Sequence, residues 1–415
     1  MRSSNTIIIV ISALLIIFAW PHDVNSQEFE LVGSYDSLAY AENVTTDSNF
    51  AYVSDHALGL VIFDISDPSQ PLYLGRYDSP YFVFDANVIG DRAYIAAGSS
   101  EPYIGMFYII DIYDKANPFL VGSLNLGTTE ATAITTDGIY WAYVANGSSI
   151  RVIQYAEPEN PALENTIYTT NWVSDIYWDY QNELLFATIG SGGLLIYDVD
   201  DRIEPPLLGS CETPGMTHGV ALDNLNRSYA YVADGDSGMQ VINYYNRQNP
   251  YIVASYRTSD AVLGIDVNGS FAYLAVADSG VEVVNISNPL NPTRVASANT
   301  VSRARGICWD DYHVFVAAEE ALEIYAYDTF DCTYVPGDIN NSGRANGIDV
   351  TYGVYFFKGG SAPPIACDCF PHGSMYVAGD VNGNCVFNGI DLVYYVWALW
   401  GIYPIRYCPD CPPRR

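Results

Sequence analysis

A repeat of about 44 residues fills most of this chain and limits what it can fold into. Six prolines recur at steps of 47, 43, 44, 45 and 42 residues: Pro71, Pro118, Pro161, Pro205, Pro250 and Pro292. Five of the six follow Asn or Gln, and Asn-Pro in particular favours a turn. Each unit therefore ends one element at a turn and starts the next at a proline.

A strand-like apolar run lies before each of these prolines, and a seventh lies near residue 325. The runs are 59–65, 107–112, 150–155, 193–199, 239–244, 281–286 and 322–327. Three more strands fit each unit, as in 72–77, 86–89 and 93–96. Four strands in about 44 residues match one propeller blade. Runs that are apolar on both faces suit a sheet packed between two neighbours, whereas one wet face would give cleaner alternation.

Residues 29–330 hold about seven such units, so the sequence predicts a mainly β fold, a seven-bladed β-propeller. An outer-type strand at 31–35 precedes the first complete blade, and the seventh blade lacks an outer strand after Tyr327. We expect the N-terminal strand to pair there and close the ring, which leaves no free edge at the junction. Six or eight blades stay open as alternatives.

The runs Leu60-Val61-Ile62-Phe63-Asp64 and Leu194-Leu195-Ile196-Tyr197-Asp198 resemble the core of LVIVD-repeat proteins, which are bacterial secreted or surface β-propellers. The resemblance spans nearly all of residues 29–330. It implies a propeller domain over 27–330 and an address outside the cell, but no reaction.

Two stretches near the C-terminus, 337–349 and 379–391, share the pattern G-D-(I/V)-N-x-(S/N)-x-x-x-N-G-I-D. Oxygen-bearing side chains at loop positions 1, 3, 5, 9 and 12 have the spacing of an EF-hand calcium loop. An apolar segment follows each loop, 350–357 and 392–400, and a glycine after each segment, Gly359 and Gly401, indicates a helix end. The alternative is a pair of Asn/Gly-rich turns without metal.

Loop plus helix, given twice, resembles the dockerin repeat, which implies a small α-helical, calcium-loop (dockerin-like) domain over 331–415, with its repeats at 337–359 and 379–401. The resemblance implies two calcium sites. Their ligands would be Asp338, Asn340, Ser342, Arg344 (backbone), Asn346 (through water) and Asp349, then Asp380, Asn382, Asn384, Val386 (backbone), Asn388 (through water) and Asp391. Loop position 6 calls for glycine, which Gly343 provides in the first loop, whereas Cys385 makes the second loop depart from the pattern.

The dockerin resemblance also implies a cohesin-like partner or a cell-surface scaffold. Loop positions 10 and 11 are Gly347-Ile348 and Gly389-Ile390, not the hydroxyl pair common in cellulosome dockerins. The same pair in both halves would allow two inverted docking modes.

The first 26 residues have the pattern of a secretory signal peptide, with Arg2 before an apolar run at 7–20 and small Ser26 at the expected cleavage position. A membrane anchor is the alternative, although the run is short for a full span. The net charge of −31 would repel nucleic acid and anionic membranes. We therefore expect a mature chain that is secreted or surface-attached, with no nucleic-acid partner and no membrane span.

Six of the eight cysteines lie in or beside the predicted calcium-loop domain: Cys332, Cys367, Cys369, Cys385, Cys408 and Cys411. An exported address favours disulfides there, while the spacing of Cys367-Asp368-Cys369 and Cys408-Pro409-Asp410-Cys411 leaves zinc open. We expect Cys211 and Cys308 to be buried single thiols, with a pair as the alternative.

No catalytic set is evident in the sequence. His56, His218 and His313 fall in different blades, without an i,i+4 pair. His218 and Met216 lie in a loop before an innermost strand, and such loops gather around one mouth of the channel, beside Tyr81-Phe82 and Trp172. Ordinary loop packing is one interpretation of this region, and a binding mouth for a glycan or peptide is the other.

Two functions remain. The first is a binding or scaffold protein, whose propeller presents a recognition surface and whose calcium-dependent dockerin-like module docks to a cohesin-like partner. The second is an extracellular polysaccharide-degrading component of the glycoside hydrolase type, which would need two carboxylates flanking a cleft at the mouth.

Overall fold

The computed structural model describes residues 29–222, 228–310 and 313–327. Further on it describes Ile339, Val350, 354–358, 367–369, 373–375, Val393, 395–397 and Leu399. The predicted signal peptide lies outside the described residues. In the part of the chain that is described, no helix is long and apolar enough to cross a membrane.

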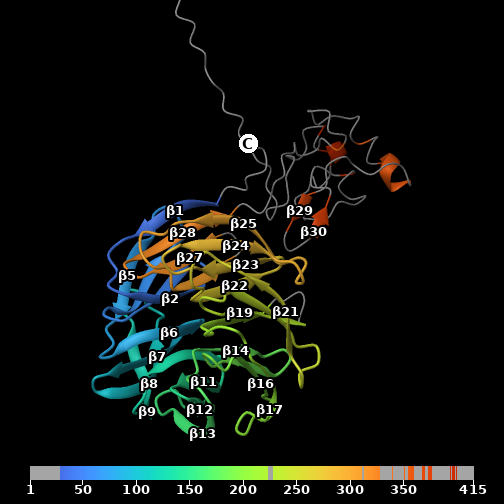
Figure 1. Cartoon of the computed structure of the whole chain (residues 1–415). Helices are drawn as coiled ribbons and strands as arrows, with labels where there is room; N and C mark the ends of the chain where they lie inside the picture. The colour runs from blue at the N-terminus through green and yellow to red at the C-terminus, as the bar shows by residue number, and fades with distance from the viewer. Residues whose placement is uncertain are drawn as a thin grey trace, which may run out of the picture.

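Seven four-stranded antiparallel sheets follow one another around a channel (Figure 1). Blades 1 to 3 are β2 (Ala41–Asp47), β3 (Phe50–Asp55), β4 (Gly59–Asp64) and β5 (Leu72–Tyr77); β6 (Phe82–Ile89), β7 (Arg92–Ser100), β8 (Tyr103–Asp111) and β9 (Phe119–Gly127); β10 (Ala131–Thr136), β11 (Trp141–Asn146), β12 (Ser149–Gln154) and β13 (Ala162–Tyr168). Blades 4 and 5 are β14 (Asp175–Asp179), β15 (Leu184–Thr188), β16 (Leu194–Asp198) and β17 (Leu207–Cys211); β18 (Gly219–Leu222), β19 (Tyr229–Ala233), β20 (Met239–Asn243) and β21 (Tyr251–Tyr256).

Blade 6 is β22 (Gly264–Asn268), β23 (Phe271–Ala275), β24 (Val281–Asn285) and β25 (Thr293–Ala298). Blade 7 combines both ends of the propeller: β26 (Gly306–Trp309), β27 (His313–Ala318), β28 (Ala321–Tyr327) and β1 (Phe29–Tyr35). The innermost strands of successive blades contact one another all the way round, including β26 with β2. The predicted seven blades are confirmed.

The N-terminal strand closes the ring, as predicted. β1 pairs antiparallel with β28, from Phe29 opposite Tyr327 to Tyr35 opposite Leu322 (Figure 1). The Tyr35 ring also meets the Phe63 ring of blade 1 edge-on, with centroids 4.8 Å apart. One strand thus completes blade 7 and packs against blade 1, so β28 is not left unpaired where the two ends of the propeller meet.

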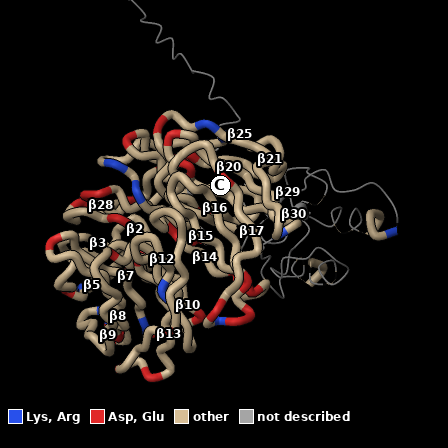
Figure 2. Tube along the Cα trace, turned by 60° about the horizontal axis from the view of Figure 1, so that its bottom comes forward, with Lys and Arg blue, Asp and Glu red and all other residues tan. Residues whose placement is uncertain are grey.

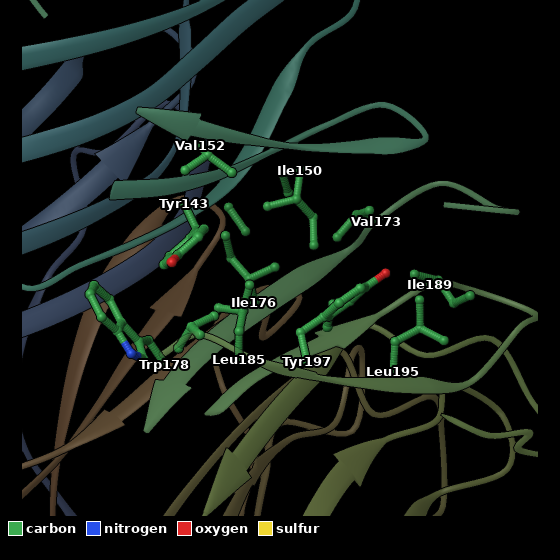
Figure 3. Packing of buried hydrophobic residues seen from close by; sticks show 14 residues of the cluster. Tyr143, Ile150, Val152, Val173, Ile176, Trp178, Leu185, Ile189, Leu195 and Tyr197 are labelled. Carbon is green, nitrogen blue, oxygen red and sulfur yellow. The ribbon is translucent and has the colours of Figure 1, made fainter. Parts of the chain in front are cut away.

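The core lies between the blades because the central strands are apolar on both faces. In the contact of blades 3 and 4, Tyr143 and Val152 face Ile176, Trp178 and Leu185 (Figure 3). The Tyr143 and Trp178 rings meet edge-on at 5.2 Å, an arrangement that aromatic pairs favour. Each blade is therefore buried between its neighbours, as the runs without strict alternation predicted.

The Asn-Pro and Gln-Pro pairs mark turns, as predicted. In five blades the residue before the proline donates its N–H to the carbonyl three residues earlier: Gln70 to Asp67, Asn117 to Asp114, Asn160 to Glu157, Asn249 to Asn246 and Asn291 to Asn288. The proline immediately precedes the outer strand, where its missing N–H costs no ladder hydrogen bond.

Glycine in several outer strands leaves room for the backbone of the turn in the next blade. A Cβ on Gly122 of β9 would overlap the backbone carbonyl oxygen of Pro158, in the turn before β13. Gly122 pairs with Ile109, and Ala254 of blade 5 occupies the matching place opposite Val241. The close approach of a backbone carbonyl explains the glycine in blade 2.

We predict that Gly122→Ala destabilises the propeller by about 1–3 kcal/mol, because the new methyl group meets backbone that cannot move aside cheaply. Urea unfolding would measure the change. The matched control, Ala254→Gly, should cost less than about 1 kcal/mol. Equal stability of Gly122→Ala and the wild-type protein would contradict this account of the blade contact.

In the C-terminal part, the described residues of both segments predicted to be helical are helical: Val350 and 354–357, then Val393, 395–397 and Leu399. Ile339 and Tyr395 are both buried. A short antiparallel hairpin, β29 (Cys367–Cys369) with β30 (Gly373–Met375), lies between them in the sequence. These are short stretches, and they do not by themselves make a complete helical domain.

The predicted calcium ligands lie outside the described residues: Asp338, Asn340, Ser342, Arg344, Asn346, Asp349, Asp380, Asn382, Asn384, Val386, Asn388 and Asp391. The pairing of the six C-terminal cysteines lies outside them as well. The calcium, disulfide and zinc interpretations therefore stay predictions.

Candidate binding site at the channel mouth

Seven residues, one from each blade, form a ring at one mouth of the channel. We call Glu42, Phe84, Thr132, Ser174, His218, Leu263 and Arg305 the mouth ring. In blades 4 to 7 the ring residue donates its backbone N–H to the second strand of its own blade: Ser174 to Thr188, His218 to Ala233, Leu263 to Ala275 and Arg305 to Ala317. In blades 1 to 3 it is the extra residue of a β-bulge.

The mouth ring separates two cavities. The outer one, the mouth cavity, has a volume of about 620 Å³. The inner one, the channel cavity, has a volume of about 320 Å³, and all seven ring residues line it too. The mouth cavity falls within the size range of small-molecule sites, about 300–1,000 Å³.

Two exposed apolar side chains stand on the wall of the mouth cavity, each two residues before its ring residue. They are Trp172, before Ser174, and Met216, before His218, and they are 46% and 59% exposed. Arg303 has the same place before Arg305. The wall thus carries an aromatic and a thioether group from blades 4 and 5, and a guanidinium group from blade 7.

Arg305 of the mouth ring is held by neighbouring acids. Its Nε lies 2.8 Å from Oε1 of Glu319, and its Nη1 lies 3.4 Å from Oε2 of Glu42. Its guanidinium also lies 4.6 Å from the Tyr40 ring centroid. Burial raises the pKa of the Glu42 carboxyl, against the opposing effect of Arg305. These two carboxylates offset the charge of Arg305.

His56 supports the wall of the mouth cavity from behind. Its ring stacks on Tyr40 with centroids 4.5 Å apart, and it meets Phe84 at 4.7 Å and Phe82 at 5.4 Å. Burial, and then the charge of Arg305, lower the pKa of His56 to about 4. The imidazole is therefore neutral near pH 7 and acts as a packing group.

Three half-buried aspartates link blades inside the channel cavity. Asp85 Oδ2 accepts the Ile134 N–H at 2.8 Å, Asp175 Oδ2 accepts the Val220 N–H at 2.9 Å, and Asp266 Oδ2 accepts the Trp309 N–H at 2.8 Å. Each thus bonds the next blade, from blades 2, 4 and 6. The sequence reasoning missed them, although each begins an Asp-Ala, Asp-Ile or Asp-Val pair in an innermost strand.

Burial raises the pKa of these carboxyls. For Asp175 the pKa rises to about 7, with a further contribution from Asp85, while the N–H groups of Val220 and Ile176 oppose the rise. For Asp266 the pKa rises to about 6. Their oxygens accept backbone N–H groups, and Asp85 also accepts the Asn43 side-chain amide, which suits a structural role.

The three histidines of the propeller do not come together in one catalytic group. His218 lines the mouth cavity, His56 packs behind its wall, and His313 begins β27 at the other end of its blade, with Nδ1 3.7 Å from Oδ1 of Asp310. Glu42 is the one carboxylate among the residues that line the mouth cavity. No group of three or more potential metal ligands occurs among the residues that the structure describes.

Of the loop residues predicted to surround the mouth, the structure brings Trp172, Met216 and His218 together. Phe82 lies behind the wall against His56, while Tyr81 packs into the core between blades 1 and 2 and does not line the mouth cavity. Arg303, Arg305 and Glu42 were missed. A signal was available, because each stands just before or within an innermost strand at the repeat position of His218 or Met216.

Cys211 and Cys308 are free thiols, as predicted. Cys211 is buried, as predicted, whereas Cys308 is half-buried, and burial raises the pKa of both thiols. Cys308 lines the channel cavity, and its Sγ lies 3.8 Å from the Thr46 hydroxyl.

The LVIVD repeat model matches residues 39–79, 83–126, 214–258 and 261–300, which correspond to blades 1, 2, 5 and 6. The protein is thus a seven-bladed β-propeller that contains LVIVD repeats.

No curated protein matches this chain. Among solved structures, a crystal structure of Raptor from Chaetomium thermophilum is similar over 75% of this chain, with a TM-score of 0.60 and 12% sequence identity. The match spans 30% of the Raptor chain. At this identity the likeness shows the fold alone.

We predict that ionisation of Asp175 destabilises the propeller as the pH rises from about 4 to 7. The folded pKa lies above the unfolded value of about 3.9, so in this window the folded state binds more protons than the unfolded state. In Asp175→Asn this contribution is absent. The stability of the wild-type protein relative to the variant, measured by urea unfolding, should therefore fall across the window.

His56→Gln is a control of opposite sign. The folded pKa of His56 is lowered to about 4, so its protonation favours the unfolded state. The stability of the wild-type protein relative to His56→Gln should therefore rise with pH. A difference between the wild-type protein and Asp175→Asn that stays constant with pH would contradict the assignment.

Proposed function

We propose that this protein is an exported binding protein whose propeller holds a glycan at the channel mouth. The observation that supports this most directly is the mouth cavity itself, a concave site of about 620 Å³ to which all seven blades contribute. It combines an exposed aromatic ring, an exposed thioether and several polar side chains, the composition typical of a small-molecule site.

Binding fits the mouth better than hydrolysis does. A glycoside hydrolase needs two carboxyl groups about 5–10 Å apart across the scissile bond. Of the residues that line the mouth cavity, Glu42 is a carboxylate, and Arg305 holds it. The aspartates below the ring accept backbone N–H groups of neighbouring blades. The polysaccharide-degrading alternative therefore has no acid pair at the mouth to support it.

We predict that Trp172→Ala reduces glycan affinity by about 2 kcal/mol, since a sugar ring would lose its stacking surface. A glycan array with the full chain would find the ligand, and calorimetry would measure the loss. The control is Tyr113→Ala, which removes a ring that is 77% exposed in the turn after β8, at the far end of blade 2. An affinity unchanged by Trp172→Ala would place the glycan elsewhere.

The second part of the proposal concerns attachment. In it, the dockerin-like segment binds calcium through the two loops and docks the propeller to a cohesin-like partner or a cell-surface scaffold. Two matching loops support this, and so do the helical residues 354–357 and 395–397, which fall in the expected segments. Without calcium the loop carboxylates repel one another, so metal binding would drive folding of the segment.

We predict that the full chain binds two calcium ions in calorimetry, and that Asp338→Asn and Asp380→Asn each remove one. Binding should be weaker than in acid-rich loops, because Ser342 and Asn384 replace carboxylates at loop position 5. Docking to a purified cohesin should require calcium and fail after chelation. If the calcium titration released or absorbed no heat and the helix content did not change, the attachment part of the proposal would be wrong. The proposal of a glycan at the mouth would be unaffected.

A further inference from the structure

We infer that the ligand of the mouth carries a carboxylate on a sugar ring, that is, a uronate, and that Arg303 binds this carboxylate. The inference rests on the proposed function and adds the chemical class of the ligand. Two observations carry it: the different pairing of the two mouth arginines, and the apolar wall formed by blades 4 and 5.

Arg303 is the mouth arginine that is available to a ligand. Glu42 and Glu319 hold Arg305, whereas Arg303 meets one acid, Asp278, with Nη1 3.5 Å from Oδ1. The Asp278 side chain is 72% exposed, and such pairs contribute little. The Arg303 Nε is buried and has no hydrogen-bond partner among the described residues.

Because Nε is buried, a ligand would reach the other N–H groups of the Arg303 guanidinium, whose side chain is 36% exposed. A guanidinium presents its N–H groups in a planar fork that matches the two oxygens of a carboxylate. Arg303 thus offers its terminal N–H groups to a carboxylate.

Two arginines lie at the mouth of a strongly acidic protein, each beside acidic side chains. Burial lowers the pKa of His218, and the charges of Arg303 and Arg305 lower it further. The net charge of −31 is spread over the chain, with Asp and Glu scattered around the rim (Figure 2). At physiological salt, charges more than about 8–10 Å away are largely screened. An anion in the mouth cavity would therefore interact mainly with the nearest groups, and among these Arg303 is the cation whose acid partner is exposed.

The rest of the wall suits a sugar. Trp172 and Met216 provide an apolar surface for a ring face, and Asn171 and Ser191 add an amide and a hydroxyl beside them. A peptide bound by strand addition would need a free backbone edge, but the N–H groups of Ser174, His218 and Arg305 already bond their own blades. Side chains therefore carry the recognition, as a saccharide requires.

The test uses calorimetry of the full chain with trigalacturonate and with its fully methyl-esterified form, which keeps the rings and removes the charge. We expect the wild-type protein to prefer the acid by about tenfold or more. Arg303→Gln should abolish this preference by weakening acid binding and leave the affinity for the ester unchanged. Arg303→Lys should restore it in part, because the charge returns without the fork.

Arg76→Gln is the matched control. Arg76 also pairs with one exposed acid, Asp78, and the two arginines are equally exposed, 37% for Arg76 and 36% for Arg303. It belongs to the outer strand β5, away from the mouth cavity. Its loss should leave both affinities as they are in the wild-type protein. Thermal unfolding of every variant verifies that the propeller stays folded.

The outcomes separate the two claims. If the wild-type protein bound the acid and the ester equally, and Trp172→Ala removed this binding, the uronate inference would be wrong and the proposed function would stand. Binding of a tripeptide with a free C-terminus, but of neither sugar, would overturn the glycan class. Binding of neither sugar nor peptide would overturn both the inference and the mouth proposal.

Discussion

The pairing of β1 with β28 is the contact on which the rest of the structure depends. It joins residues 29–35 to 322–327, at opposite ends of the propeller, so it forms when nearly the whole repeat is in place. Without β1, blade 7 would have three strands and an open edge, and the apolar side chains of Val32 and Tyr35 would leave the core between blades 7 and 1. Closure also fixes the position of β26, which carries Arg305 toward Glu42 of blade 1.

The candidate site follows from this closure. Every blade contributes one residue to the mouth ring at the same place, either in a β-bulge or just before the innermost strand. Repetition fixes where these side chains stand, and differences among the repeats decide what they are. Blades 7 and 1 supply the charges of Arg305 and Glu42, blades 2 and 6 supply Phe84 and Leu263, and blades 3 and 4 supply hydroxyls. One face of a symmetric fold is thereby made chemically asymmetric.

Much of the fold could be predicted from the sequence because the repeat is strong. The proline spacing, the apolar runs and the incomplete seventh blade indicated seven blades and closure by the N-terminal strand, and all of these are confirmed. The extended hairpin β7–β8 was not foreseen, since its extra residues interrupt the period without changing the apolar pattern. The calcium loops were predicted from spacing alone and stay predictions.

The site was harder to predict, for a physical reason. Trp172, Met216 and His218 were placed at the mouth because loops before innermost strands converge there. Arg303 and Arg305 occupy the same repeat positions, yet a lone arginine in a sequence does not reveal its partners. Only the closed ring shows that Glu42, from the first blade, neutralises Arg305 of the last, and that Arg303 keeps an unpaired Nε.

Hydrogen–deuterium exchange of the full chain, with and without trigalacturonate, tests most directly whether the closed ring builds a binding mouth. The account predicts added protection in the loops before β14, β18 and β26, which carry Trp172, Met216 and Arg303, and slow exchange of β1 together with β28 in both states. Protection confined to the turns at the opposite face, or fast exchange of β1 while the other blades stay protected, would contradict it.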